Sequence, residues 1–230
     1  MAAPSPQELQ ELNAALDNCR LCLDAGYEIT PGAIYDHPHS SDVMLIGQAP
    51  GVTEVEARRP FNAGSGRRLF TWLEQAGWEE SEFRATNVMT AVTKCYPGKA
   101  RNGKGDRLPS RAEQRLCRPY LLREFALYRP RLIIPVGGLA IKLFFPPSLK
   151  LNQIIGTAAY FPPSDEPVSF DLGKAKHFEA FDPSLPGGGR WLVPLPHPSG
   201  ASLWPNKPAN KALIDRAAAI LGDIRRAWEL

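Results

Sequence analysis

A chain of 230 residues, 43% hydrophobic and 22% charged, is long enough to bury one substantial core, and we expect one domain over residues 1–230. The first ten residues contain no basic segment followed by an apolar run. No stretch of the chain is long and apolar enough to cross a bilayer, which argues against a membrane protein and favours a cytoplasmic one. The net charge is only +3, so an argument for nucleic acid binding must rest on local clusters of basic residues.

Apolar periodicity and turn residues predict the elements of the first half of the chain. Leucines at helical spacing over 7–16 predict a helix that leads directly into the first cysteines. The apolar run 43–46 predicts a buried strand that ends in the glycine- and proline-bearing turn 47–51. A helix over 64–76 and a strand over 88–93 follow.

The second half repeats this alternation of helix and strand. Ser110 and Glu113 have capping-box spacing and predict a helix that runs to about residue 128. The predicted elements after it are a strand over 132–136, a helix that ends before Pro146, a hairpin and loop over 152–181, a strand over 191–194, and a helix over 210–228.

Strands separated by helices predict an α/β fold, specifically a three-layer α/β/α sandwich with a central, mainly parallel four-stranded sheet. Right-handed crossovers bring every strand-to-helix loop to the carboxyl edge of such a sheet, where ligands bind. The loops that we expect at this edge are 47–51, 93–98, 137–138 and 197–200. Their convergence predicts a single ligand site.

Four cysteines are the chain's only thiols, and we expect them to be reduced in a cytoplasmic protein. Cys19 and Cys22 form a C-x-x-C pair, and Cys95 and Cys117 lie far downstream beside basic residues. The pattern is compatible with one closed metal site, but ordinary buried thiols would give it as well. Zinc and an iron–sulfur cluster both accept four thiolates, so spacing alone does not separate them.

Several motifs together resemble the family four uracil-DNA glycosylases. They are the segment 47–70, the basic KCYPG of 94–98, the segment 106–117 that ends in a cysteine, and HPSG at 197–200. The resemblance covers nearly the whole chain in order. It implies a DNA repair enzyme that acts on uracil-containing DNA and carries a four-iron, four-sulfur cluster on Cys19, Cys22, Cys95 and Cys117.

The resemblance also implies roles for residues of the predicted pocket. Phe61 would stack on a uracil flipped out of the duplex, and His197 would donate a hydrogen bond to uracil O2 and stabilise the departing base. Ser199 and the backbone of Gly47 and Ala49 would line the pocket. The alternative interpretations are a loop anchor for Phe61, a structural histidine, and an ordinary strand-to-helix turn.

Three positions depart from the family pattern. Gln48, a catalytic candidate by its position, stands where a carboxylate is usual, and it cannot act as a general base. Ala49 occupies the place of the catalytic aspartate of other uracil-DNA glycosylases. Ala91 falls at the position that often holds a uracil-reading asparagine, and Asn87 lies too early in the strand to replace it. Glu54 is the acidic residue that could supply the missing charge, although a solvated loop glutamate is the simpler interpretation.

The remaining candidates concern DNA. Lys94 and Arg107 belong to a basic segment, 94–111, whose only acidic residue is Asp106, which suits phosphate contacts or a solvated loop. Leu203 and Trp204 are candidates for a wedge in the duplex, or else they pack the last helix.

Three functions follow. The first is a monomeric, monofunctional glycosylase that works without a carboxylate, and the second is a uracil- or abasic-DNA-binding protein with little turnover, which Gln48 and Ala91 favour. The third is a zinc hydrolase, against which the cysteine-only ligand set argues.

Overall fold

The computed structural model describes residues 4–101, 103, 105–163, 175–186, 188–200 and 202–230. Within them, six strands form one sheet in the order β2-β1-β3-β6-β4-β5. The strands are β1 (Val43–Gly47), β2 (Val88–Ala91), β3 (Leu132–Pro135), β4 (Ala158–Phe161), β5 (Lys176–Phe178) and β6 (Arg190–Leu192). The neighbours among β2, β1, β3 and β6 are parallel, whereas β4 is antiparallel to both β6 and β5.

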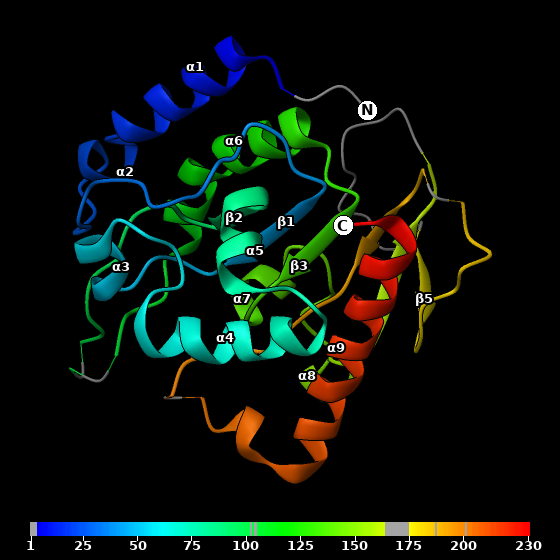
Figure 1. Cartoon of the computed structure of the whole chain (residues 1–230). Helices are drawn as coiled ribbons and strands as arrows, with labels where there is room; N and C mark the ends of the chain where they lie inside the picture. Colours follow the sequence, from blue (N-terminus) through cyan, green and yellow to red (C-terminus); the bar gives the residue numbers. More distant parts are fainter. Residues whose placement is uncertain (1–3, 102, 104, 164–174, 187, 201) are drawn as a thin grey trace.

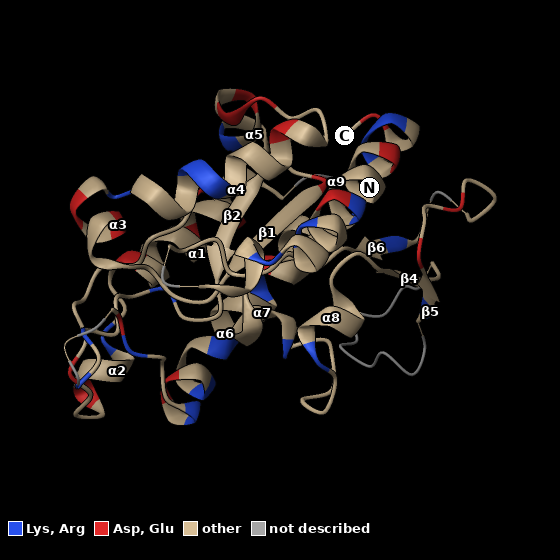
Figure 2. Cartoon of the chain, turned by 90° about the horizontal axis from the view of Figure 1, so that it is seen from below, with Lys and Arg blue, Asp and Glu red and all other residues tan. Residues whose placement is uncertain are grey.

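Helices cover both faces of this sheet (Figures 1 and 2). In Figure 2, α4, α5 and α9 lie on one side of β1 and β2, and α6, α7 and α8 lie on the other. The helices are α1 (Pro6–Asp17), α2 (Leu21–Asp24), α3 (Val52–Ala57), α4 (Ala63–Gln75), α5 (Glu80–Thr86), α6 (Arg111–Tyr128), α7 (Gly138–Ile141), α8 (Leu151–Ile154), the short 3-10 helix η2 (Trp204–Asn206) and α9 (Pro208–Trp228). The predicted three-layer α/β/α sandwich is confirmed.

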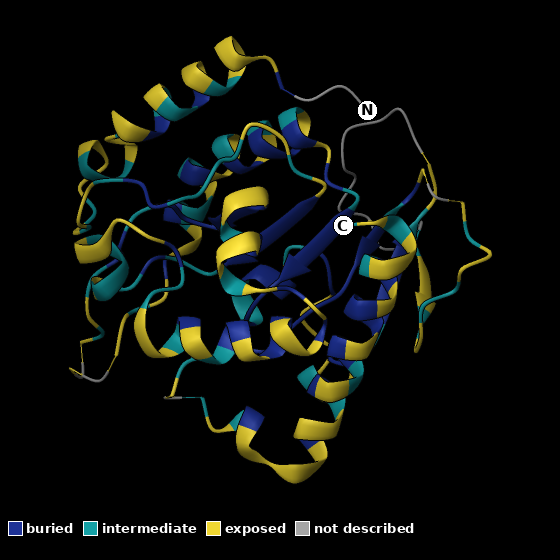
Figure 3. Cartoon of the chain, viewed as in Figure 1, coloured by how far each residue is buried: buried dark blue, intermediate teal, exposed yellow. Residues whose placement is uncertain are grey.

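The core lies between the sheet and its two helical layers. Every residue of β1, β2 and β3 is buried, because helices cover both faces of these strands and their sequences are almost entirely apolar (Figure 3). The helices are amphipathic and keep their exposed residues on the outer surface of the molecule. The predicted capping box is present at the start of α6, where the Glu113 N–H donates to Ser110 Oγ over 3.2 Å.

The expected number of strands was wrong. The four predicted strands are the parallel part of the sheet, and β4 and β5 add an antiparallel edge. Both added strands lie in the predicted hairpin of 152–181, whose residues 164–174 are outside the described part of the chain. They are only four and three residues long, too short for alternation of polar and apolar residues to show that they join the main sheet.

Sheet register brings the predicted loops together. Gly47 at the end of β1 pairs with Ala91 at the end of β2. Next to them, Val136 and Leu195 form an isolated parallel bridge beyond β3 and β6, two residues before His197. The strand ends thus meet at one edge of the sheet.

None of the helices in the described residues combines the length and the apolar character that a bilayer-spanning segment requires.

Candidate active site

A cleft of about 710 Å³ opens at the carboxyl edge of the sheet. It is bounded by the turn after β1, the start of α4, the end of β2 and the loop after β6. Every residue that the sequence predicted for catalysis or base binding lines it: Gly47, Gln48, Ala49, Phe61, Ala91, His197 and Ser199. The predicted convergence of strand-end loops is therefore confirmed as geometry.

Phe61 lies over the end of β1 in an unusual backbone conformation. Its φ is +48°, in the left-handed region that a bulky residue rarely adopts. A Cβ atom on Gly47 would lie only 2.8 Å from Cζ of Phe61, so the ring occupies space that any other residue at position 47 would take. The aromatic ring forms part of the cleft wall, where an apolar planar group could stack on it.

His197 is fixed by the backbone on two sides. A Cβ atom on Gly137 would lie 2.8 Å from Cδ2 of His197, so the imidazole packs directly on this glycine. The Ser199 N–H donates to Nδ1 of His197 over 3.3 Å. Since Nδ1 accepts a hydrogen bond, the neutral ring carries its proton on Nε2.

Burial lowers the pKa of His197 below its ordinary value of 6.5. The imidazole is therefore neutral at pH 7. A neutral ring with its proton on Nε2 is a hydrogen-bond donor for an oxygen that gains negative charge.

A pair of carboxylates lines the cleft behind the turn after β1. Oε2 of Glu54 accepts the Gly51 N–H over 2.7 Å at the start of α3. A Cβ atom on Gly51 would meet Oε2 of Glu54 at 2.6 Å and Oδ2 of Asp106 at 3.0 Å, so both carboxylates face this glycine. Burial, reinforced by the charge of Asp106, raises the pKa of Glu54.

Glu54 is therefore half-buried in the cleft wall and is no freely solvated loop residue. Sequence reasoning did not identify Asp106, which also accepts the Tyr96 hydroxyl over 2.9 Å. The available signal was its position as the single acidic residue of a basic segment.

Ala91 and Asn87 lie at opposite ends of β2. Ala91 is beside Gly47 in the cleft, whereas Asn87 precedes the strand and is 6% exposed. Its side-chain nitrogen donates to Thr86 Oγ1 over 3.1 Å, away from the cleft. Asn87 does not replace the missing amide, as its sequence position predicted.

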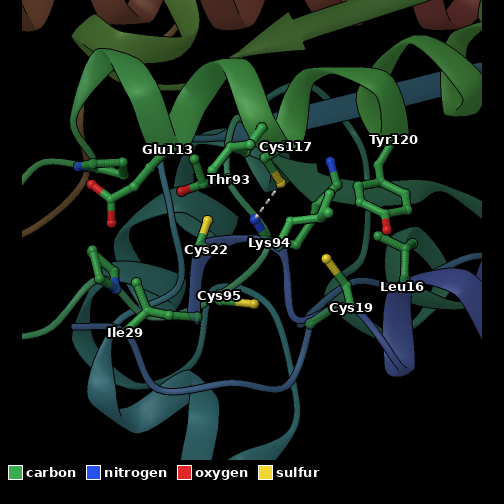
Figure 4. Close-up of a pocket in the computed structure, with 15 residues that line it drawn as sticks. Leu16, Cys19, Cys22, Ile29, Thr93, Lys94, Cys95, Glu113, Cys117 and Tyr120 are labelled. Atoms are coloured by element: carbon green, nitrogen blue, oxygen red, sulfur yellow. Dashed lines mark hydrogen bonds between the residues drawn. The ribbon is translucent and has the colours of Figure 1, made fainter. Parts of the chain in front are cut away.

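The four cysteines line a second, much smaller pocket of about 30 Å³ beneath α6 (Figure 4). Cys117 comes from α6, Cys22 from α2, and Cys19 and Cys95 from adjoining loops, and their sulfur atoms face a common space. The backbone N–H of Lys94 donates to Sγ of Cys117 over 3.3 Å. Within the described ranges, no three His, Cys, Asp or Glu side chains are arranged to hold a single metal ion.

Three of the thiols, those of Cys22, Cys95 and Cys117, are poor acids in this pocket. Burial, followed by repulsion from the neighbouring cysteines, raises the pKa of Cys22 to about 11 and that of Cys95 to about 12. Burial also raises the pKa of Cys117. Four thiolates could coexist here only beside compensating positive charge, which a metal group supplies. An all-sulfur donor set with an N–H group directed at one sulfur fits an iron–sulfur cluster.

The prediction that the Lys94 side chain contacts DNA is wrong. Lys94 is 2% exposed, and its Nζ donates to Oε2 of Glu124 over 2.9 Å and to the carbonyl of Ala91 over 2.7 Å. Glu124 is itself fully buried and also contacts Nε2 of His37 at 3.1 Å. A lysine beside a cysteine in a basic segment resembles a surface cation, and its buried partner, 30 residues away in sequence, gives no local signal.

The other candidates for DNA contact differ in exposure. Arg107 forms two hydrogen bonds to Glu113, of 2.6 and 2.8 Å, and one of 3.1 Å to the carbonyl of Glu28, so its guanidinium ties three segments together. Leu203 is 73% exposed, the most exposed of the large apolar residues in the described chain. Trp204 packs against the core, as the alternative interpretation predicted.

The fold and the cleft define an α/β protein with a mainly parallel sheet covered on both faces and an open cleft at the carboxyl edge of the parallel strands. A sequence profile of the uracil DNA glycosylase superfamily matches residues 34–221, and the chain belongs to this superfamily. The match includes the cleft residues and two of the four cysteines.

Three curated relatives share the name type-4 uracil-DNA glycosylase. The protein from Pyrobaculum aerophilum is 33% identical over 137 residues, which are 59% of this chain and 63% of that relative. The protein from Sulfurisphaera tokodaii is 26% identical over 60% of this chain and 58% of its own length. The protein from Archaeoglobus fulgidus is 29% identical over 46% of this chain and 48% of its own. The matches thus span about half to just over three fifths of these relatives.

Proposed function

We propose that the protein is a monofunctional DNA repair glycosylase that hydrolyses the N-glycosidic bond of deoxyuridine in DNA and leaves an abasic site. The observation that carries the proposal is the neutral imidazole of His197, with Nε2–H as its free donor, in the same cleft as the Phe61 ring. Membership of the superfamily and the names of the relatives support the same activity.

In the proposed mechanism, a uracil leaves the duplex and enters the cleft, where it stacks on Phe61. Nε2–H of His197 donates to O2 of uracil, and this bond strengthens as the bond between C1′ and N1 breaks and the base departs with the electron pair. Water then adds to C1′ and releases one proton to solvent. The backbone of Gly47 and Ala49, with Ser199, shapes the pocket around the base.

Gln48 can orient water but cannot remove its proton. Glu54 is the nearest candidate for a base in the loop, but its Oε2 is engaged by the Gly51 N–H. We therefore assign Glu54 to holding the loop. Charge stabilisation by His197 and by the phosphates of the substrate then drives departure of the base, and water arrives late.

A second candidate is a protein of the same fold that binds uracil or abasic sites with little turnover. Gln48 and Ala91 favour it. Family four members usually have a carboxylate at the position of Gln48 and an asparagine amide at the position of Ala91, and this chain has neither group. The two functions differ in one observable, the formation of abasic sites.

We further propose that Cys19, Cys22, Cys95 and Cys117 hold a four-iron, four-sulfur cluster. The bound cluster would supply a cross-link between the segment that contains α2 and the body of the protein, without a role in breaking the glycosidic bond. The family resemblance and the shared pocket of four thiols support this cofactor.

Leu203 is the proposed wedge in the duplex, because it is exposed and six residues from His197. Arg107 remains a candidate for phosphate contact through its exposed edge. We infer a monomer with one domain that works on DNA in the cytoplasm or nucleoid.

The test uses end-labelled duplexes that carry uracil, cytosine or thymine at one position. Incubation with the purified protein and then with alkali should cleave only the uracil strand, at the uracil position. Tight binding to the uracil duplex without alkali-sensitive sites would support the second candidate. Neither binding nor cleavage would reject both.

A further inference from the structure

Arg84 of α5 holds the backbone on both sides of the Phe61 nitrogen. Its Nη1 donates to the carbonyl of Pro60 over 2.8 Å, and its Nη2 donates to the carbonyl of Phe61 over 2.9 Å. The side chain of Arg84 is only 10% exposed, so these bonds form largely out of water. A guanidinium can make two parallel bonds of this kind because its donors are planar and fixed relative to one another.

The contacted segment needs such support. Phe61 has a φ of +48°, and Ala63 two residues later has a φ of +55°, so two residues with side chains adopt left-handed conformations in one turn. The carbonyl of Phe61 also lies against α4, where its oxygen occupies the space that a Cβ atom on Gly66 would take. The turn therefore persists only where its surroundings hold it.

Arg84 is itself held in place. Its Nε donates to Oε1 of Glu80 over 2.8 Å, and its guanidinium lies over the ring of Phe70, 4.4 Å from the centroid. Phe70 is buried in the main core, and Glu80 lies one turn earlier on α5. A chain of contacts thus leads from the core through Arg84 to the turn that carries Phe61.

We propose that Arg84 is the positioning residue for base stacking, which fixes the Phe61 ring over Gly47 before a base enters the cleft. The inference rests on the proposed function, because it assigns to Phe61 the stacking role. A ring held in advance binds the base without first having to be ordered. Arg84 does not line the cleft itself and acts only through the backbone of residues 60 and 61.

The first test is a double-mutant cycle on binding. The probe is a duplex with one 2′-fluoro-deoxyuridine, whose glycosidic bond resists hydrolysis, and its affinity is compared with that of a duplex with cytosine at the same site. Loss of base stacking predicts that Phe61→Ala reduces the preference for uracil about 5- to 150-fold. Arg84→Met should reduce it about tenfold in the parent and less than about twofold in Phe61→Ala, because both changes remove the same ordered ring.

The control and the conservative variant separate positioning from general destabilisation. Arg131→Met is the matched control, because Arg131 also stacks on an aromatic ring, that of Trp228 at 4.6 Å, but lies at the opposite end of the sheet. It should leave the preference unchanged. Arg84→Lys keeps the charge without the paired donors and should not restore the preference. Equal losses from Arg84→Met in both backgrounds, or parental preference in Arg84→Met, would overturn the proposal.

A second test requires no DNA and stays informative if the proposed function fails. A single 4-fluorophenylalanine at position 61 should give one sharp ¹⁹F resonance in the otherwise parental protein and in Arg131→Met. Arg84→Met or Arg84→Lys should shift or broaden this resonance. An unchanged resonance in both Arg84 variants would show that the ring is held without Arg84 and would overturn the proposal. If the parent instead fails to prefer uracil over cytosine in the binding test, the proposed function is rejected, but the ¹⁹F result still tests whether Arg84 holds the ring.

Discussion

The cysteine pocket and the cleft are neighbours that share Pro97 in their linings, but they differ in size and in the groups that line them. The pocket has a volume of about 30 Å³ and is lined mainly by apolar residues and thiols, whereas the cleft has about 710 Å³ and its lining mixes glycines and polar side chains with apolar ones such as Phe61. Burial raises the pKa of the Cys22, Cys95 and Cys117 thiols, which therefore keep their protons unless a cation is present, whereas the imidazole of the cleft is neutral and ready to donate.

The difference indicates separate tasks. A closed set of four soft donors suits a group that stays in place and stabilises the fold. An open cleft where glycines let the chain approach a ligand closely suits a site that admits and releases a ligand. Substitutions in the pocket should therefore change stability and cofactor content, and substitutions in the cleft should change the binding and excision of uracil.

The largest expected effect comes from removing a thiol. Cys117→Ser should abolish the brown colour of anaerobically purified protein and lower the midpoint of thermal unfolding by about 10 °C or more, because binding of the metal group contributes directly to folding. Iron and sulfide analysis with a thermal melt measures both. Colourless parental protein with stoichiometric zinc would contradict the cluster.

The next effect concerns stacking in the cleft. Phe61→Ala should weaken binding of uracil-containing DNA by about 1–3 kcal/mol, the usual contribution of one base stacked on an aromatic side chain. Fluorescence anisotropy at fixed salt measures the affinity, and the iron content should be unchanged. If Phe61→Leu, which is apolar but not aromatic, binds as tightly as the parent, stacking is not its role.

A smaller effect is expected from Glu54, one of the two carboxylates that line the cleft. Glu54→Gln keeps an oxygen acceptor for the Gly51 N–H and removes the charge, so single-turnover excision should slow less than about tenfold. Gln48→Glu should also change the rate little. The pH profile of the excision rate should have the same shape on its acidic side in the parent and in Glu54→Gln.

A loss of about a hundredfold or more in Glu54→Gln, with unchanged DNA affinity and iron content, would show that a carboxylate activates water. The raised pKa of Glu54 would then place the acidic limb of the parental profile above pH 4.5, because the active carboxylate would be lost at a higher pH than usual.

The smallest effect tests the support of the pocket. The hydrogen bonds from Arg107 lower the pKa of Glu113 from 4.5 to about 2. The resulting stabilisation is present above the unfolded-state pKa and disappears as the pH falls from about 4.5 towards 2. Arg107→Gln should therefore lower the unfolding midpoint at neutral pH by a few degrees at most, and this difference should shrink in acid. The exposed Arg101→Gln variant is the control, and its difference from the parent should not change with pH. If the difference between Arg107→Gln and the parent also stays constant over this range, the assignment is contradicted.

The sequence was sufficient for the parallel strands and for the loops that bound the cleft, because local signals mark both, and the family resemblance supplied Phe61 and His197 within those loops. Buried apolar strands that end in glycine turns define the carboxyl edge, and His197 follows such a strand. The sequence was insufficient where a residue contacts another residue that is distant along the chain. Neither the burial of Lys94 against Glu124 nor the contact of Arg84 with the backbone of Phe61 has a local pattern, and the edge strands β4 and β5 are too short to reveal their pairing.

The central claim is that the cleft excises uracil through a neutral His197, and the most direct test is single-turnover release of free uracil by the parent, His197→Ala and the exposed control His39→Ala. The account predicts that the parent releases uracil at a rate that does not fall as the pH drops from about 8 to 6.5. The reason is that burial holds the pKa of His197 below its ordinary value of 6.5, so the imidazole stays mainly neutral over this range. His197→Ala should be about 100- to 1,000-fold slower, with unchanged DNA affinity and iron content, and His39→Ala should equal the parent. Equal rates for His197→Ala and the parent, or no uracil released by the parent, would contradict the account.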